Sequence, residues 1–203
     1  MDSKIIISPS VASANQLKLR DEVEFAQHKG ARDIHIDIED GNFIPNITFG
    51  TKTVKGLRSC TDLPFSFHLM VTEQFEWLNF AALMKPSIVF GHYEALCYPR
   101  AFVGAARKLG VRCGLAFNPK TPIEQAKYLI DDLDGILLLA VEPDGMGENF
   151  IESVLEKADI IRGLSPKIEI WVDGNVTQDR LSMLEEHGVT NAVMGRGFFF
   201  DDR

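Results

Sequence analysis

The sequence predicts an α/β fold, a (β/α)₈ TIM barrel, from two observations. Eight apolar stretches of strand length alternate with stretches of helix length along the 203 residues, and such alternation implies a parallel sheet with right-handed crossovers. Polar side chains also gather at the carboxyl ends of several of these stretches, where barrel enzymes carry their chemistry. An open doubly wound sheet is disfavoured, because no Gly-x-Gly-x-x-Gly follows the first strand and eight units overfill the usual sheet.

The strands are predicted from apolar runs and from their limits. Residues 5–7 form a short buried run that Pro9 ends. Residues 34–39 alternate between apolar and polar side chains, which is the period of a strand. Residues 135–141 are apolar throughout, as expected for a strand covered on both faces. The expected strands are residues 5–10, 33–39, 64–70, 86–92, 111–117, 135–141, 167–173 and 189–195.

The helices are predicted from capping residues and terminal glycines. Ser13 and Gln16 resemble a capping box at the start of the first helix, and Gly30 suits its end. Thr177 and Gly188 limit the last predicted helix in the same way. The expected helices are residues 13–30, 51–60, 73–84, 99–109, 122–132, 150–163 and 177–187.

An eighth helix is missing or truncated in this pattern, because only residues 196–203 follow the eighth strand. Without that helix, apolar surface beside the first and eighth strands is exposed. We expect a neighbouring subunit to cover this surface, so that the protein is a homo-oligomer, unless the sequence itself is truncated.

Composition and charge narrow the class of protein. The chain is 45% hydrophobic and 25% charged, and no linker divides it, which predicts a single domain over residues 1–203. A net charge of −8 without a basic stripe argues against nucleic acid as a partner. The three cysteines form no Cys-x-x-Cys pair, which is typical of reduced thiols. With no signal peptide and no apolar run near the ~20 residues of a membrane span, we expect a soluble cytoplasmic protein.

Histidine and aspartate interrupt three of the apolar strands near their carboxyl ends. His35 and Asp37 lie on one face of the second strand, His68 closes the third and Asp173 closes the seventh. Buried side chains of these types need partners. A divalent transition metal such as zinc, iron, manganese or cobalt accounts for two imidazoles and two carboxylates at one barrel mouth. The alternative is that they hydrogen-bond one another.

Other polar residues receive less specific predictions. Asp40 has the opposite strand parity and is expected to cap the following loop. His92 ends the fourth strand and is expected to support the metal ligands or to be structural. His28 and His187 lie on helices beside terminal glycines, where a surface role is expected.

A set of motifs spans the chain. The longest is residues 35–50, His-Ile-Asp-Ile-Glu-Asp-Gly-Asn-Phe-Ile-Pro-Asn-Ile-Thr-Phe-Gly. The others are Ser8-Pro9-Ser10, His68-Leu69-Met70, Asn118-Pro119-Lys120-Thr121-Pro122, Val141-Glu142-Pro143 and Val172-Asp173-Gly174. By these motifs the sequence resembles the ribulose-phosphate 3-epimerase family over essentially its whole length. In detail it is similar to a bacterial branch of predicted epimerases.

The resemblance implies an isomerase of pentose phosphate metabolism, which inverts C3 of a ketose phosphate such as ribulose 5-phosphate or xylulose 5-phosphate. It implies His35, Asp37, His68 and Asp173 as ligands of a divalent metal, with Asp37 and Asp173 also serving as acid and base around an enediolate. Two carboxylates from different sides of the barrel can flank the substrate, and a metal can stabilise the negative charge. The residues implied to contact the substrate are Ser10, His68, Asp144, Gly145, Met146, Gly147, Gly174, Asn175, Gly195 and Arg196.

The chain departs from the family pattern where the phosphate is expected. The family's Pro-Gly-Phe-Gly-Gly turn is replaced by residues 143–147, Pro-Asp-Gly-Met-Gly, and Asn175 and Arg196 replace Gly and Ser in the next two turns. We expect Arg196 to bind the phosphate and Asp144 to orient it, since a guanidinium grips phosphate bidentately; alternatively, both are solvated. Glu39 replaces a methionine, and an extra carboxylate can tune the metal or bind a different sugar.

Two other functions remain open. One is an epimerase of another sugar, such as allulose 6-phosphate. The other is a non-catalytic sugar-phosphate-binding barrel, although pure binding does not need two opposed acid/base groups. A lyase or decarboxylase is disfavoured, because no strand end clearly offers a catalytic lysine.

Overall fold

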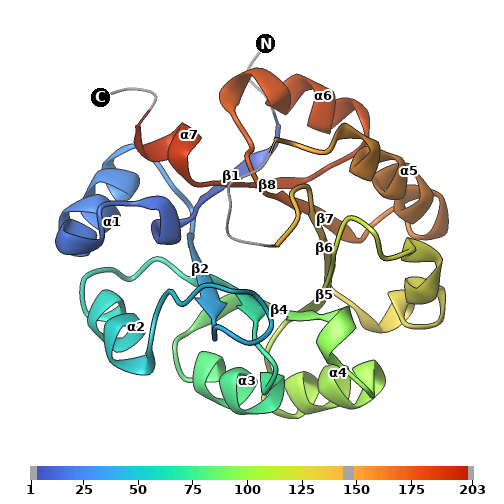
Figure 1. Ribbon diagram of the computed structural model, residues 1–203, viewed down its shortest axis with the longest axis horizontal. Coiled ribbons are helices and arrows are strands. Elements are labelled where there is room, and N and C mark those ends of the chain that lie inside the picture. The colour runs from blue at the N-terminus through green and yellow to red at the C-terminus, as the bar shows by residue number, and fades with distance from the viewer. Residues whose placement is uncertain (1–3, 144–148, 201–203) are drawn as a thin grey trace.

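The computed structural model describes residues 4–143 and 149–200, and in this part of the chain eight parallel strands form a barrel surrounded by helices (Figure 1). The predicted TIM barrel is thereby confirmed. The strands are β1 (Ile6–Pro9), β2 (Ile34–Glu39), β3 (Phe65–Met70), β4 (Pro86–His92), β5 (Cys113–Phe117), β6 (Gly135–Leu139), β7 (Glu169–Asp173) and β8 (Asn191–Met194). Each lies within one residue of, or inside, the stretch predicted for it.

The strands pair in the order β1-β8-β7-β6-β5-β4-β3-β2, each parallel to its neighbour. The ring closes between β1 and β2, where a single parallel bridge joins Ser10 to His35. The seam of the barrel therefore lies between two residues that the sequence singles out for chemistry.

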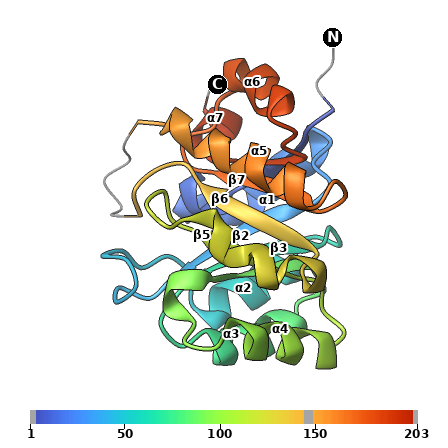
Figure 2. The same ribbon diagram turned by 90° about the vertical axis from the view of Figure 1, so that its right-hand side faces the viewer.

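Helices cover the outside of the barrel, with α1 and α2 on one side and α4 and α5 on the other (Figure 1). Figure 2 shows the strands between α5 and α6 on one side and α2 to α4 on the other. The α-helices are α1 (Leu19–His28), α2 (Thr51–Arg58), α3 (Gln74–Ala82), α4 (Pro99–Lys108), α5 (Leu155–Leu164), α6 (Leu181–Glu186) and α7 (Arg196–Phe199). The 3₁₀ helices are η1 (Val11–Ser13), η2 (Gln16–Lys18), η3 (Tyr93–Ala95), η4 (Ile123–Tyr128), η5 (Ile130–Asp132), η6 (Glu152–Val154) and η7 (Gln178–Arg180).

Four helix predictions were wrong in detail. The helices expected at residues 150–163 and 177–187 begin as the 3₁₀ helices η6 and η7, ahead of α5 and α6. The first α-helix begins at Leu19 instead of residue 13, because Asn15, not Ser13, caps the preceding turn by accepting a hydrogen bond from the Leu17 amide. Residues 122–132 form η4 and η5 instead of one α-helix. Ile123 and Ala126 are buried at a spacing of three residues, which suits the three residues per turn of a 3₁₀ helix.

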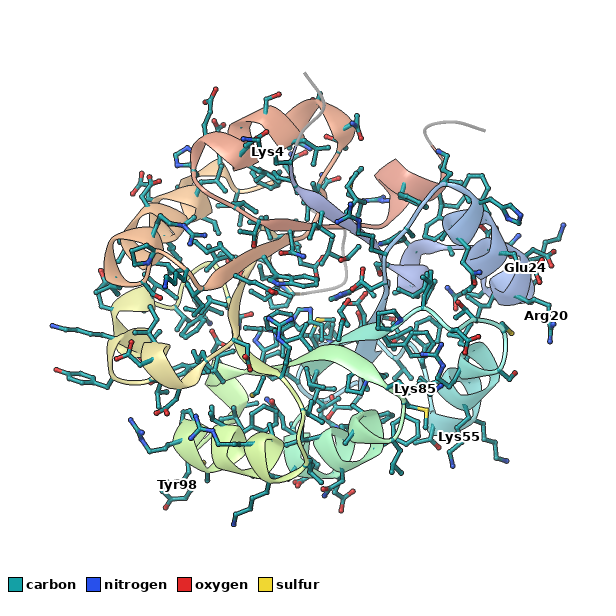
Figure 3. All side chains as sticks on the ribbon, turned by 180° about the vertical axis from the view of Figure 1, so that it is seen from behind. Lys4, Arg20, Glu24, Lys55, Lys85 and Tyr98 are labelled. Carbon is teal, nitrogen blue, oxygen red and sulfur yellow. The ribbon has the colours of Figure 1, made fainter. Side chains whose placement is uncertain are left out.

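The core has two layers. The larger one fills the space between the strands and the surrounding helices. The smaller one fills the barrel itself, where side chains from alternating strand positions meet, as is typical of this fold. Its members are Ile88, Phe90, Ala116, Leu137, Trp171 and Val193. Charged and polar side chains such as Lys55 and Tyr98 point outward from the helices (Figure 3).

The short helix α7 occupies the outer ring between α1 and α6 (Figure 1). Phe199 is fully buried there, and its ring lies 6.4 Å from that of Phe25 in α1. The helix thus covers part of the surface that a missing eighth helix was expected to expose. A hollow beside β1 remains, lined by Ile6, Ile7 and Phe198 among others.

No helix in residues 4–143 and 149–200 is long and apolar enough to cross a membrane. That residues 1–203 act as one domain stays a prediction.

The interior packing predicts a cost for enlarging Gly114. A Cβ at this position in β5 would lie 2.3 Å from the Phe90 ring and 2.6 Å from the Gly135 carbonyl oxygen. Gly114→Ala is therefore expected to lower the free energy of unfolding by about 1–3 kcal/mol, as overpacking does. Urea unfolding measures this change.

Gly104→Ala is the matched control, because nothing lies within 4 Å of a Cβ added at this position in α4. This substitution is expected to stabilise the protein by up to about 1 kcal/mol through helix propensity. Equal effects of the two substitutions would contradict the packing described for the barrel interior.

Candidate active site

Four side chains converge at the carboxyl end of the barrel. His35 and Asp37 come from β2, His68 from β3 and Asp173 from the last position of β7, and each offers an atom within 4.8 Å of the others. His35 and His68 are fully buried, and Asp37 is nearly so. The structure thus brings together the four predicted metal ligands.

The strand pattern explains this convergence. Ile34, Ile36 and Ile38 turn their side chains to the helices and are fully buried there, so the alternate positions of β2 face the barrel interior. The parallel register of β2 and β3 sets Asp37 beside His68. The polar face of β2 therefore points inward, as the sequence predicts.

The polar atoms that face one another are spaced like ligands of one ion. His35 Nε2 lies 3.3 Å from Asp37 Oδ1 and 3.8 Å from Asp173 Oδ2. His68 Nδ1 lies 3.4 Å from Asp37 Oδ1 and 3.0 Å from Asp173 Oδ2. Ligands about 2.1 Å from a tetrahedral ion are about 3.4 Å apart, given the usual zinc bond lengths.

Two of these atoms lack a hydrogen bond. Among the described residues, His35 Nε2 and Asp37 Oδ1 are buried without a hydrogen-bond partner, and leaving such atoms unpaired is costly. The other atom of each group is paired, because His35 Nδ1 contacts Ser66 Oγ at 2.9 Å and Ser10 Oγ donates to Asp37 Oδ2 at 2.5 Å. The donor set and its unpaired atoms therefore fit a divalent metal.

The close approach of imidazoles and carboxylates shifts their titration. Burial disfavours the charge on His68, but the hydrogen bond to Asp173 and the attraction of Asp173 and Asp37 outweigh it and raise its pKa to about 9. Burial opposes the charge on Asp37 too, yet attraction to His35 lowers the pKa of Asp37 far below its usual range. A ligating histidine must be neutral, so metal binding at this cluster has to displace protons.

A cavity of about 370 Å³ opens above the four side chains. Five predicted substrate contacts line it, and they are Ser10, Gly174, Asn175, Gly195 and Arg196. His68 is fully buried and is not among the lining residues. The predicted contacts Asp144, Gly145, Met146 and Gly147 lie outside the described residues.

The turns after β7 and β8 bring backbone close to this cavity. Gly174 has a φ of +106° and Asn175 a φ of 49°, in the left-handed region that favours glycine. A Cβ on Gly195 would lie 2.3 Å from Ser13 Oγ. Gly174, Asn175 and Gly195 line the cavity at these turns, which is where this fold usually binds phosphate.

Glu39 stands apart from the four clustered residues, although it shares their face of β2. Its Oε2 accepts a hydrogen bond of 2.7 Å from Asn46 Nδ2, and its side chain lines the cavity. Burial raises the pKa of the Glu39 carboxyl to about 7, and the charge of Asp37 acts in the same direction. The Glu39 carboxyl therefore faces the cavity.

The structure adds one residue that the sequence analysis missed, Glu94. His92 Nε2 lies 2.8 Å from His68 Nε2, and His92 Nδ1 lies 2.9 Å from Glu94 Oε2. Burial lowers the pKa of His92 to about 4 in spite of this carboxylate. The spacing His92-x-Glu94 at the end of β4 is the signal that could have identified the pair.

The remaining polar predictions can be checked directly. Asp40 Oδ1 accepts hydrogen bonds from the amides of Asn42 and Phe43, which confirms its role in capping the loop. His28 bonds the carbonyl of its own helix at Glu24, and His187 contacts Asp159. Both histidines lie far from the four clustered residues in the fold and on its surface.

Comparisons with known proteins agree with this geometry. The model of the family described as "Ribulose-phosphate 3 epimerase family" matches residues 6–199. The ribulose-phosphate 3-epimerase of Bacillus subtilis (strain 168) is 34% identical, over 96% of this chain and 92% of that protein. The chloroplastic ribulose-5-phosphate-3-epimerase of Arabidopsis thaliana is 36% identical, over 97% of this chain and 72% of that protein.

Solved structures support the fold alone. A mutant tryptophan synthase alpha-subunit from the hyperthermophile Pyrococcus furiosus superposes with a TM-score of 0.71 at 15% identity, over 96% of this chain and 88% of that chain. Another structure of the same subunit, from the same organism, gives a TM-score of 0.70 at 15% identity and the same coverage.

Removal of one nitrogen ligand should abolish tight metal binding. His35→Gln keeps much of the side-chain volume but loses the imidazole, so zinc affinity is expected to fall by ~100-fold or more, at least as much as the loss of a hydrogen bond to a ligand costs. Zinc at 100 times its Kd should stabilise the unsubstituted protein by about 2.7 kcal/mol. Competition with a chelating dye measures the affinity, and thermal unfolding measures the stabilisation.

The matched control is His187→Gln, a surface position whose ring contacts Asp159. This variant should bind one zinc ion with unchanged affinity. Equal loss in both variants, or none in either, would contradict the assignment of the four residues as a metal site.

Proposed function

Because the chain belongs to the ribulose-phosphate 3-epimerase family, we propose that it inverts C3 of a ketose phosphate, with ribulose 5-phosphate and xylulose 5-phosphate as the leading pair. The family makes it an isomerase that acts on carbohydrates. The observation that carries the proposal is the meeting of Asp37 and Asp173, from strands on different sides of the barrel, beneath one cavity.

The two carboxylates supply the proton transfers. One of them removes the proton from C3, next to the ketone, which leaves an enediolate and a protonated carboxyl. The other, already protonated, donates to the opposite face of C3 and becomes a carboxylate. Their roles exchange in the reverse reaction, so no redox cofactor is consumed. Ser10 Oγ donates to Asp37 Oδ2 and so fixes the plane of that carboxylate.

The metal ligands are proposed as His35, Asp37, His68 and Asp173. A divalent ion held there, of zinc, iron, manganese or cobalt, would supply positive charge against the negative charge that develops on the substrate oxygens. Both imidazole rings are buried, whereas Asp37 and Asp173 line the cavity in which the substrate is proposed to bind.

The phosphate is proposed to bind at the turns after β7 and β8. Gly174, Asn175 and Gly195 line the cavity at these turns, and Arg196 adds a positive charge there. Arg196 is exposed and lines the cavity, so its guanidinium is accessible to a phosphate. An orienting role for Asp144 stays a prediction.

The position of Glu39 supports a second candidate substrate. Its carboxyl adds a hydrogen-bonding group to the cavity, with one oxygen already bound by Asn46. The other oxygen suits a further sugar hydroxyl, as in allulose 6-phosphate, because the half-buried carboxyl lines the cavity and can accept or donate a hydrogen bond there. A non-catalytic sugar-phosphate-binding barrel remains the alternative from another class. A cytoplasmic location and a homo-oligomeric state stay predictions, and sedimentation tests the second.

Proton exchange at C3 tests the proposed reaction. The metal-loaded protein in heavy water should exchange the C3 proton of one ketose phosphate from a panel that includes allulose 6-phosphate, as followed by NMR. Asp37→Asn and Asp173→Asn should each slow this exchange by ~100-fold or more, the contribution typical of one acid/base group. Binding without exchange for every sugar would favour the non-catalytic alternative.

Arg196→Ala tests the phosphate contact. Loss of the guanidinium should raise KM for the phosphorylated sugar by roughly 10-fold or more, since a hydrogen bond to a charged group contributes about 1.5–3 kcal/mol, and should leave kcat nearly unchanged. Arg100→Ala is the control and should leave KM unchanged, because Arg100 is an exposed arginine that bonds Asp132 and the Tyr128 carbonyl and does not line the cavity. An unchanged KM in Arg196→Ala would show that this charge is solvated.

A further inference from the structure

A chain of hydrogen bonds leads away from His68 into the loops after β4 and β5. His68 Nε2 meets His92 Nε2 at 2.8 Å, and His92 Nδ1 meets Glu94 Oε2 at 2.9 Å. Both imidazoles are fully buried, and their rings stack with centroids 4.8 Å apart. Neither contact is needed to explain the barrel. What the two contacts do depends on which atom donates and which accepts in each hydrogen bond.

At the far end of these hydrogen bonds, Glu94 must act as an acceptor. Glu94 Oε1 accepts hydrogen bonds from the Asn118 amide at 2.8 Å and from Thr121 Oγ1 at 2.5 Å. A backbone amide can only donate, so the group at position 94 must present an acceptor to it. Lys157 Nζ holds this loop in place by donating to the carbonyls of Asn118, Pro119 and Thr121 at 2.6–2.9 Å.

The acceptor at position 94 determines in turn which nitrogen of His92, and then of His68, carries the proton. With a carboxylate at position 94, His92 carries its proton on Nδ1 and donates it to Glu94. Its Nε2 is then bare, so the facing nitrogen of His68 must be the donor. His68 with its proton on Nε2 leaves Nδ1 free, and Nδ1 is the atom that lies 3.0 Å from Asp173 and 3.4 Å from Asp37.

From this geometry we infer that Glu94 and His92 are positioning residues, which hold His68 in the Nε2–H tautomer and so present its Nδ1 lone pair to the metal. The inference rests on the proposed function, in which His68 is a metal ligand. Outer hydrogen bonds of this kind orient ligating histidines, and their loss typically costs 10–100-fold in metal affinity. The ring of Phe43, 4.6 Å from that of His92, covers the pair.

Glu94→Gln reverses the chain with almost no change of shape. The amide oxygen of the new side chain must stay with the Asn118 amide, so its NH₂ group is left facing His92 Nδ1. His92 then becomes an acceptor at Nδ1 and a donor at Nε2, which forces the His68 proton onto Nδ1. Zinc affinity, measured by chelator competition, is expected to fall 10–100-fold.

If Glu94 only supported the loop, Glu94→Gln would leave zinc affinity unchanged, because the substitution keeps the hydrogen bonds to the loop. Glu169→Gln is the matched control: Glu169 lies at the other end of a barrel strand and accepts from Trp171 Nε1 and Arg112. This variant should bind zinc as tightly as the unsubstituted protein. In a His92→Phe background, Glu94→Gln should add no further loss, because the chain is already interrupted.

A second measurement needs no substitution. Long-range ¹H–¹⁵N spectra of the zinc-loaded protein should show His68 protonated at Nε2 and His92 protonated at Nδ1. Unchanged affinity in Glu94→Gln, or His92 protonated at Nε2 in the unsubstituted protein, would overturn the inference while leaving the metal site intact. Failure of the unsubstituted protein to bind zinc at all would instead contradict the proposed function, and the inference with it.

Discussion

Burial of charge at the barrel mouth is the constraint on which the rest of the site depends. Two imidazoles and two carboxylates lie above an interior filled by aromatic and aliphatic side chains such as Phe90 and Trp171. Ionised groups in such surroundings are costly unless each is paired. Neighbouring groups pair the outward-facing atoms of His35, Asp37 and His68. His35 Nε2 and Asp37 Oδ1, which face the centre, stay unpaired, and a metal ion would complete this arrangement.

The barrel and the site support each other at the seam. β1 and β2 share no ladder, and one bridge joins Ser10 to His35. The Ser10 hydroxyl also donates to Asp37. The closure of the barrel therefore uses the same residues that orient a metal ligand, so a change at this seam should disturb geometry and stability together. On the other side, the chain through His92 and Glu94 ties His68 to two loops.

Periodicity accounts for most of what the sequence could predict. The alternation in β2 fixed which residues face inward, and the polar interruptions of β3 and β7 identified His68 and Asp173, because parallel strands end at one edge. The 3₁₀ helices at residues 123–132 were missed, since buried residues three positions apart are also typical of an α-helix. Glu94 was missed because its partners, at positions 118 and 121, become neighbours only in the fold.

The central claim is that one ion binds between the four side chains. Diffraction from zinc-loaded crystals, measured on both sides of the zinc absorption edge, tests it most directly. The account predicts one anomalous peak about 2.0–2.2 Å from His35 Nε2, Asp37 Oδ1, His68 Nδ1 and Asp173 Oδ2. A peak elsewhere, with these four groups still bonded to one another, would contradict it.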